Sequence, residues 1–145
     1  MNENQFIIDW KQKGDKETNE TYRFFCYFIA FNWFYNKYEG KEEYTRIKNC
    51  IQNYVINNDK YNPIVFLKSN EWKRLVCDSR SGIIKKYILE EENQVIRLFL
   101  SIYQIRCNLF HGSKWMCSKR DTQLVKESAD VLQDFLQRQI FEKSR

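Results

Sequence analysis

The sequence predicts an all-α fold, and three observations carry this prediction. Glycine and proline are scarce, with four and one in 145 residues, which argues against a turn-rich all-β fold. Aromatic residues reach 17%, which argues against a disordered chain. Apolar residues recur at helical spacing between the few turn-forming positions. These turn-forming positions are Gly14, Gly40, Pro63, Gly82 and Gly112.

The N-terminal part of the chain predicts one long aromatic helix. Residues 1–16 are mostly polar and form either a short helix or a peripheral, partly ordered arm. Thr18 or Asn19 can cap the next helix, which runs to about Tyr38. Because this helix is apolar on most sides, it is either the central helix of the bundle or meets a second subunit. Its regular apolar positions are Tyr22, Phe25, Phe28, Ile29 and Trp33, and its less regular ones are Phe24, Phe31 and Phe34.

Two asparagines lie one turn apart within this aromatic helix. Asn32 and Asn36 sit amid apolar residues, and a buried amide needs hydrogen-bond partners. Asn36 fits a satisfied core hydrogen bond. Asn32 is retained as a candidate that faces and supports a functional site.

The middle of the chain predicts shorter elements. An amphipathic helix begins at Glu42 or Glu43 and runs to about Asn57, and a loop rich in turn formers follows it. Residues 64–80 read as one or two short helices, and residues 83–90 as another.

Two long helices complete the expected fold. Glu91 or Asn93 opens a helix that ends at His111, and Gly112 is placed to follow its C-cap. Asp121 is expected to cap the last helix, which is the clearest amphipathic helix in the chain. The apolar stripe of the first of these helices is Val95, Ile96, Phe99, Ile102, Tyr103, Leu109 and Phe110.

The length and the charge of the chain limit its possible domain organisation and partners. A chain of 145 residues can bury its own core, and no linker or repeat divides it. We therefore expect a single domain over residues 1–145. The net charge is +5, and its positive excess lies in residues 41–120. This distribution is compatible with a phosphate-rich partner and equally with an ordinary solvated surface.

Cysteine usage and hydropathy indicate a cytoplasmic protein. The five cysteines are widely spaced and form no C-x-x-C pair, which favours free thiols in a reducing cytosol. The first residues are polar and acidic, unlike a signal peptide. The most apolar run, residues 24–35, is about half the length of a membrane span, so no membrane partner is expected.

The chain's only histidine, His111, lies five residues after Arg106. On an ideal helix five residues turn by about 500°, which leaves roughly 140° between the two side chains. They can act together if the backbone relaxes before Gly112, or if two copies of the motif meet across a two-fold axis. Asn108 lies three residues before His111 on the same face, where it can orient the imidazole.

The chemistry of this pair suits phosphodiester cleavage. Histidine accepts or gives a proton near neutral pH, and a helix C-terminus favours its charged form. Arginine binds two phosphate oxygens at once. The pair can activate a ribose 2′-OH, or protonate a leaving 5′-oxygen while the arginine neutralises the phosphorane, and neither step requires a metal.

The string from Arg106 to Gly112, Arg-Cys-Asn-Leu-Phe-His-Gly, resembles the R-N-x-L-x-H-G form in bacterial members of the HEPN superfamily (higher eukaryotes and prokaryotes nucleotide-binding). The aromatic first long helix and the amphipathic last helix are similar too, so the resemblance covers most of residues 18–142. It implies an antiparallel four-helix bundle core with short additional helices, and a homodimer whose two motifs face one cleft. It also implies metal-independent endoribonuclease activity that leaves a 2′,3′-cyclic phosphate, without a cofactor, in a toxin–antitoxin, antiphage or CRISPR-linked system.

Residue roles follow from the resemblance position by position. Arg106 becomes the phosphate and transition-state ligand, and His111 the acid and base. The family commonly has a polar residue directly after the arginine, but Cys107 occupies that place, so either Asn108 substitutes for it or the activity is weakened. Ser113 occupies the place of a tyrosine that is adenylylated in one toxin branch, so that form of control is not expected.

A basic-aromatic patch follows the motif. Lys114, Lys119 and Arg120, with Trp115, can hold RNA phosphates and stack a base, or form a solvated turn. Cys107, Cys117 and His111 match no zinc spacing and lack a fourth ligand, so no metal site is expected.

An alternative function remains open. The chain can be a non-catalytic HEPN-like module that binds a nucleotide, RNA or protein. Both functions allow an antitoxin or a defence-system protein as a partner.

Overall fold

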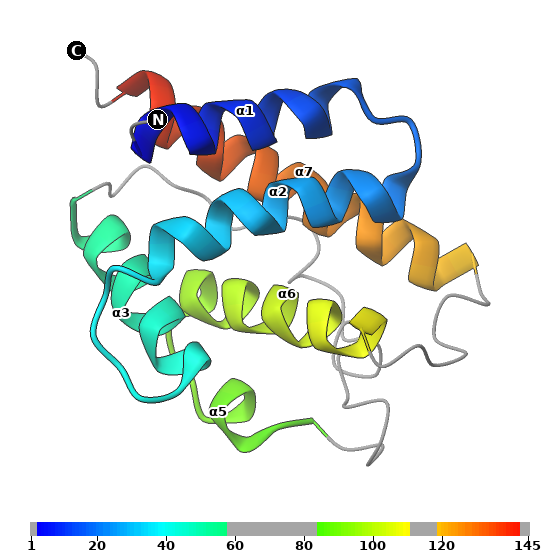
Figure 1. The fold of residues 1–145 in the computed structure, drawn as a ribbon. Coiled ribbons are helices and arrows are strands. Elements are labelled where there is room, and N and C mark those ends of the chain that lie inside the picture. The colour runs from blue at the N-terminus through cyan, green and yellow to red at the C-terminus, as the bar shows by residue number, and fades with distance from the viewer. Residues whose placement is uncertain (1–2, 58–83, 111–118, 143–145) are drawn as a thin grey trace. The chain divides into compact units, whose positions relative to one another are not determined.

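The structure is a computed structural model that describes residues 3–57, 84–110 and 119–142 (Figure 1). All regular structure in these ranges is helical, so the predicted all-α class is confirmed for them. The short helix or helices expected within 64–80 lie outside the described residues. Among the helices described, none combines the length and the apolar character needed to cross a membrane. The helices are α1 (Glu3–Lys16), α2 (Glu20–Tyr35), α3 (Glu43–Asn57), α5 (Lys86–Leu89), α6 (Gln94–Phe110) and α7 (Lys119–Glu142).

The chain forms two compact units. The first unit comprises Met1–Phe34 and Thr122–Arg145, and the second comprises Tyr35–Asp121. The first therefore contains α1, almost all of α2 and nearly all of α7. The second contains α3, α5 and α6. The expected single domain stays a prediction.

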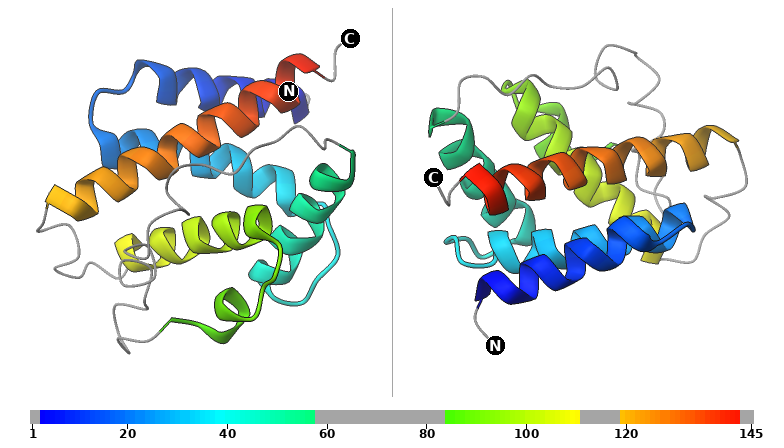
Figure 2. Two further views of the ribbon diagram at one scale, coloured as in Figure 1. Left: turned by 180° about the vertical axis from the view of Figure 1, so that it is seen from behind. Right: turned by 90° about the horizontal axis from the view of Figure 1, so that it is seen from above.

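Polar contacts join the three helices of the first unit. α1 and α2 run antiparallel, and α7 lies beside them (Figures 1 and 2). The Asp15 carboxylate of α1 accepts hydrogen bonds from the Tyr27 hydroxyl at 2.6 Å and from the Gln133 amide at 2.9 Å. Arg23 of α2 pairs with Asp130 of α7 at 2.8 Å. One charged side chain on each helix is thus held by a neighbouring helix.

The buried face of α2 differs from the predicted one. Its fully or almost fully buried aromatic residues are Phe24, Tyr27, Phe28, Phe31 and Tyr35. Three positions expected in the regular stripe are exposed instead: Tyr22 at 61%, Ile29 at 38% and Trp33 at 43%. Because α2 is apolar on both sides, spacing alone offers two stripes, and packing within the first unit selects one. That packing includes edge-on contacts of Phe31 and Phe34 with Phe135, at 5.5 Å between ring centroids.

Of the two alternatives for the N-terminal segment, α1 is the helix, and Gly14 lies inside it rather than at a turn. Ile7 is buried, and Phe6 packs against Trp33 of α2 at 4.6 Å between ring centroids. A Cβ at Gly14 would come within 2.4 Å of the Tyr27 ring. The glycine is therefore required by close helix packing, which a reading of glycine as a helix breaker does not detect.

Helix ends follow the predicted caps at two places. Asn19 caps α2, its Oδ1 accepting from the Tyr22 amide at 3.1 Å. Asn93 caps α6, its Oδ1 accepting from the Val95 and Ile96 amides at 3.0 Å.

Two other helix ends differ from the sequence expectation. α2 ends at Tyr35, three residues earlier than expected. α7 begins at Lys119, so Asp121 lies within its first turn and is not the cap. Lysine and arginine favour helix, which allows α7 to start before the aspartate.

Asn36 follows the end of α2 and is exposed, not part of the core as predicted. Its Oδ1 accepts a hydrogen bond from Nε of Arg46 at 3.0 Å. Arg46 also donates to the Gly40 carbonyl at 2.9 Å. Gly40 has φ of +152°, a backbone conformation that favours glycine, so this turn between α2 and α3 agrees with the predicted break.

In the second unit, α6 packs against α3 and α5. Tyr44 of α3 stacks on Tyr87 of α5 with ring centroids 4.1 Å apart. The buried residues of α6 occupy nearly its whole circumference, as Leu98, Phe99, Leu100 and Ser101 show in succession. The helix buried on most sides is therefore α6, whereas α2 keeps one face exposed.

Candidate active site

The Arg106 motif lies on the C-terminal half of α6, which ends at Phe110. Tyr103, Arg106, Cys107 and Phe110 are spaced three and four apart, so they share one face of the helix. These four residues, the Arg106 face, are partly or fully exposed, whereas Ile105 and Asn108 beside them are buried. The Arg106 face thus holds most of the side chains in this half of the helix that reach the surface, and half-buried Leu109 lies outside it.

Arg106 and Phe110 form a cation–π pair on this face. The guanidinium carbon lies 4.5 Å from the centroid of the Phe110 ring. Phe110 is 61% exposed, so it does not belong to the apolar stripe in which the sequence placed it. The pair presents a charged group that can hold phosphate beside an aromatic face that can stack a base.

Tyr103 and Glu43 add groups that the sequence reading did not include. Burial is the main cause that raises the pKa of Tyr103, and its neighbours Cys107 and Glu43 raise it further against the opposing effect of Arg106. The Tyr103 hydroxyl therefore stays protonated at neutral pH and can donate a hydrogen bond. The Glu43 carboxylate, at the start of α3, accepts a hydrogen bond from the Tyr35 hydroxyl.

Part of this grouping was visible in the sequence. Tyr103 precedes Arg106 by three positions and Cys107 by four, which places all three on one helix face. Glu43 had no such signal, because it reaches the site through the fold of the second unit.

Asn108 lies away from Arg106. Two residues on a helix turn by about 200°, and Asn108 is fully buried. Its Oδ1 accepts a hydrogen bond from the Gln104 amide at 2.9 Å, and the Tyr87 hydroxyl lies 3.4 Å from Oε1 of Gln104. The structure therefore places Asn108 in a buried chain of hydrogen bonds. It does not place Asn108 beside Arg106, so this geometry does not support the alternative in which Asn108 substitutes for the polar residue that Cys107 replaces. Orientation of His111 by Asn108 stays a prediction.

Several predicted site residues lie beyond the described part of the chain. His111 and Lys114 lie outside it, as do the side chains of Lys119 and Arg120 at the start of α7. Asn32 is half-buried on α2 and belongs to the first unit, whereas Arg106 belongs to the second. Of the predicted site residues, only Arg106 is seen on the Arg106 face among the described residues, and Tyr103, Cys107 and Phe110 beside it were not predicted to belong to the site.

Comparison with known proteins adds no relative: no family model, curated protein or solved structure matches this chain.

Proposed function

We propose that this chain is a metal-independent endoribonuclease of the HEPN type. The observation that carries the proposal is the placement of Arg106 on an outward face of α6, beside an exposed aromatic ring and five residues before the only histidine. The Phe110 ring beside the guanidinium can also contact RNA.

The proposed reaction transfers the phosphate within the RNA strand. The ribose 2′-oxygen attacks phosphorus as His111 takes its proton, in one copy or across a dimer cleft. The bond from phosphorus to the 5′-oxygen breaks, and that oxygen receives a proton from the protonated partner imidazole or from water. Arg106 neutralises the extra negative charge on the phosphorane. The products are a 2′,3′-cyclic phosphate and a 5′-hydroxyl.

We also propose the HEPN-like antiparallel four-helix core for the long helices. After α1, the described chain supplies four helices of 16, 15, 17 and 24 residues, namely α2, α3, α6 and α7. This number and these lengths support such a core, with α1 and α5 as the additional helices.

The exposed stripe of α2 supports the proposed homodimer. Tyr22, Ile29 and Trp33 lie on one helix face, and large apolar residues exposed along one face commonly mark an interface. Static light scattering at micromolar concentration should give the mass of a dimer, and Ile29→Glu should reduce it to that of a monomer. Gln123→Ala, an exposed change on α7, is the control that should remain dimeric. A monomeric wild-type protein would argue against a shared cleft.

Cleavage is tested with mixed single-stranded RNA in EDTA. Wild type should cut, whereas His111→Ala and Arg106→Ala should each lose activity by about a hundredfold or more. Arg138→Ala removes an arginine that pairs with Asp134 on α7, and it should keep full activity. Circular dichroism melts establish that each variant is folded. Cleavage by both wild type and His111→Ala, or by neither, would refute the mechanism.

The non-catalytic module is the second candidate, and two observations favour it. Cys107 occupies the place of the usual polar residue, and Asn108 is buried away from Arg106. If wild type binds RNA without cutting it, and Arg106→Ala weakens that binding, this function replaces the first. A neighbouring antitoxin or defence gene would then indicate the biological system for either function.

A further inference from the structure

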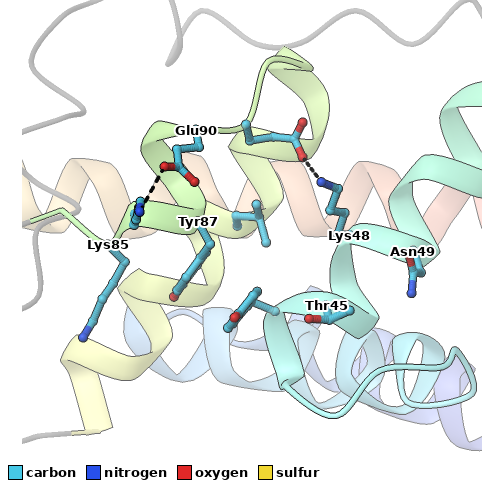
Figure 3. A pocket seen from close by; sticks show the side chains of 10 residues that line it. Thr45, Lys48, Asn49, Lys85, Tyr87 and Glu90 are labelled. Atoms are coloured by element: carbon cyan, nitrogen blue, oxygen red, sulfur yellow. Dashed lines mark ion pairs between the residues drawn. The ribbon is translucent and has the colours of Figure 1, made fainter.

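A hollow of about 680 Å³ opens in the second unit between α3 and the segment around α5 (Figure 3). This volume is within the range of small-molecule sites, roughly 300–1,000 Å³. Its wall includes aromatic rings, lysines and two carboxylates, with buried Leu100 of α6 among them. All of its lining residues lie within one compact unit.

Glu91 is the unusual polar group in this lining. Its side chain is 9% exposed, and Oε1 is buried and accepts no hydrogen bond from the described part of the chain. Nζ of Lys48 lies 3.2 Å from that oxygen, close enough for an ion pair but without hydrogen-bond alignment. Lys48 itself is half exposed, and a bound group would reach Oε1 by displacing its ammonium group. The other oxygen, Oε2, accepts from the Asn93 amide at 3.2 Å, which fixes the carboxylate in position.

The rest of the lining offers a flat surface and positive charge. Tyr87 and Tyr44 stack with an angle of 2° between their rings, so together they present one rigid aromatic block. Figure 3 shows Lys85 and Tyr87 extending from the same side of the α5 segment. A ring that contacts this block would carry its anionic substituent within reach of lysine charge.

We propose that this hollow binds a guanine nucleotide, with the base against the tyrosines, its donor edge on Glu91 and its phosphate near Lys85. A carboxylate only accepts hydrogen bonds, so it favours a ring edge made of donors. Guanine presents two adjacent donors, N1–H and the N2 amino group. Adenine and cytosine each place an acceptor beside their amino group, and uracil flanks its single N–H with two carbonyl oxygens, so each meets repulsion from the carboxylate.

The guanine can come from a free nucleotide or from an RNA strand. The site uses none of the residues of the Arg106 face, so the proposal holds whether or not the chain cleaves RNA. Binding is measured with ligands that cannot be cut, which keeps its outcome separate from that of the cleavage assay.

Isothermal titration calorimetry with guanosine and adenosine 5′-monophosphate tests the site on the full chain. Wild type should bind the guanine nucleotide about tenfold or more tightly than the adenine nucleotide, and Glu91→Gln should remove most of this preference. Glu92→Gln is the matched control, because that neighbouring carboxylate is exposed and does not line the hollow. It should leave the preference unchanged.

A short 2′-O-methyl oligoadenylate, with or without one central guanine, separates the two sources. Tighter binding of the guanine-containing strand than of the free nucleotide assigns the site to RNA, and the reverse assigns it to a free nucleotide. Three results would overturn the proposal: no guanine binding at millimolar concentration, equal affinity for both nucleotides, or equal losses of the preference in Glu92→Gln and Glu91→Gln. If the Glu91 variant fails to fold, the comparison of the guanine and adenine nucleotides on wild type still tests the proposal.

Discussion

Replacing Asn108 by alanine tests whether this residue of the motif acts by packing or by chemistry. Its amide oxygen accepts the hydrogen bond from Gln104 within a buried part of the second unit. The substitution removes that acceptor and leaves the Gln104 amide, which is 2% exposed, without this hydrogen bond. A buried polar group that loses its partner costs more than the hydrogen bond itself contributes.

The expected cost follows from these two terms. The unpaired Gln104 amide costs about 1–3 kcal/mol, and the lost packing of a small buried side chain adds about 1 kcal/mol. We therefore expect Asn108→Ala to lower the free energy of unfolding by about 2–4 kcal/mol. For a chain of this length, that corresponds to a fall of roughly 6–12 °C in Tm.

A double-mutant cycle measured by urea unfolding isolates the Gln104–Asn108 interaction. In a Gln104→Ala background the donor is already gone, so Asn108→Ala should cost about 1–2 kcal/mol less than in wild type. Gln123→Ala, an exposed change on α7, should alter stability by about 0.5 kcal/mol or less. Additive effects in the cycle would refute the structural role of Asn108. An Asn108→Ala variant that is as stable as wild type but inactive on RNA would also refute it, and would indicate that Asn108 takes part in the reaction.

Three further predictions concern the first unit. Gly14→Ala should destabilise the protein, because overpacking against Tyr27 costs about 1–3 kcal/mol. This cost exceeds the gain in helix propensity, which is at most about 1 kcal/mol. A variant with a higher Tm than wild type would contradict the close contact between Gly14 and Tyr27. Burial acts to raise the pKa of Asp15, but hydrogen bonds from Lys11, Tyr27 and Gln133 outweigh it and lower that pKa. The stabilisation by Asp15 is therefore complete above its unfolded pKa of about 4 and is lost as pH falls through the lower folded value. Urea unfolding of wild type and Asp15→Asn should thus differ at pH 7 and converge in acid, and a constant difference would exclude this linkage. Burial, with a smaller contribution from Glu17, raises the pKa of the Cys26 thiol, so iodoacetamide at pH 7.5 should modify Cys26 more slowly than a free thiol, as peptide mapping can measure.

The features that were predictable from sequence are local ones. Asn19 and Asn93 cap their helices because capping needs only a side-chain oxygen and the next two or three amides, all close in sequence. The all-α class follows from a similarly local rhythm of apolar residues. Helix spacing also places Arg106 on the same face as Tyr103, Cys107 and Phe110, whereas the exposure of that face is known only from the structure.

The features that were missed depend on other helices. Trp33 and Phe31 are both aromatic residues of α2, and only packing within the first unit decides that one is exposed and the other buried. Gly14 reads as a breaker until Tyr27 is placed over it. The burial of Asn108 and its hydrogen bond from Gln104 could not be read from the motif, and Glu43 has no sequence relation to α6 at all.

The burial of α6 around nearly its whole circumference constrains how this protein can evolve. A helix that is buried on most sides accepts few substitutions at its buried positions, because almost any change of volume or polarity there disturbs packing. Sequence divergence should therefore spare α6 and accumulate on surfaces such as the outer side of α7. The Arg106 face is the exception on α6, since its side chains can change without disturbing the core. Replacement of Tyr103, Cys107 or Phe110 by selection can then alter what the motif recognises while the helix that holds Arg106 stays fixed.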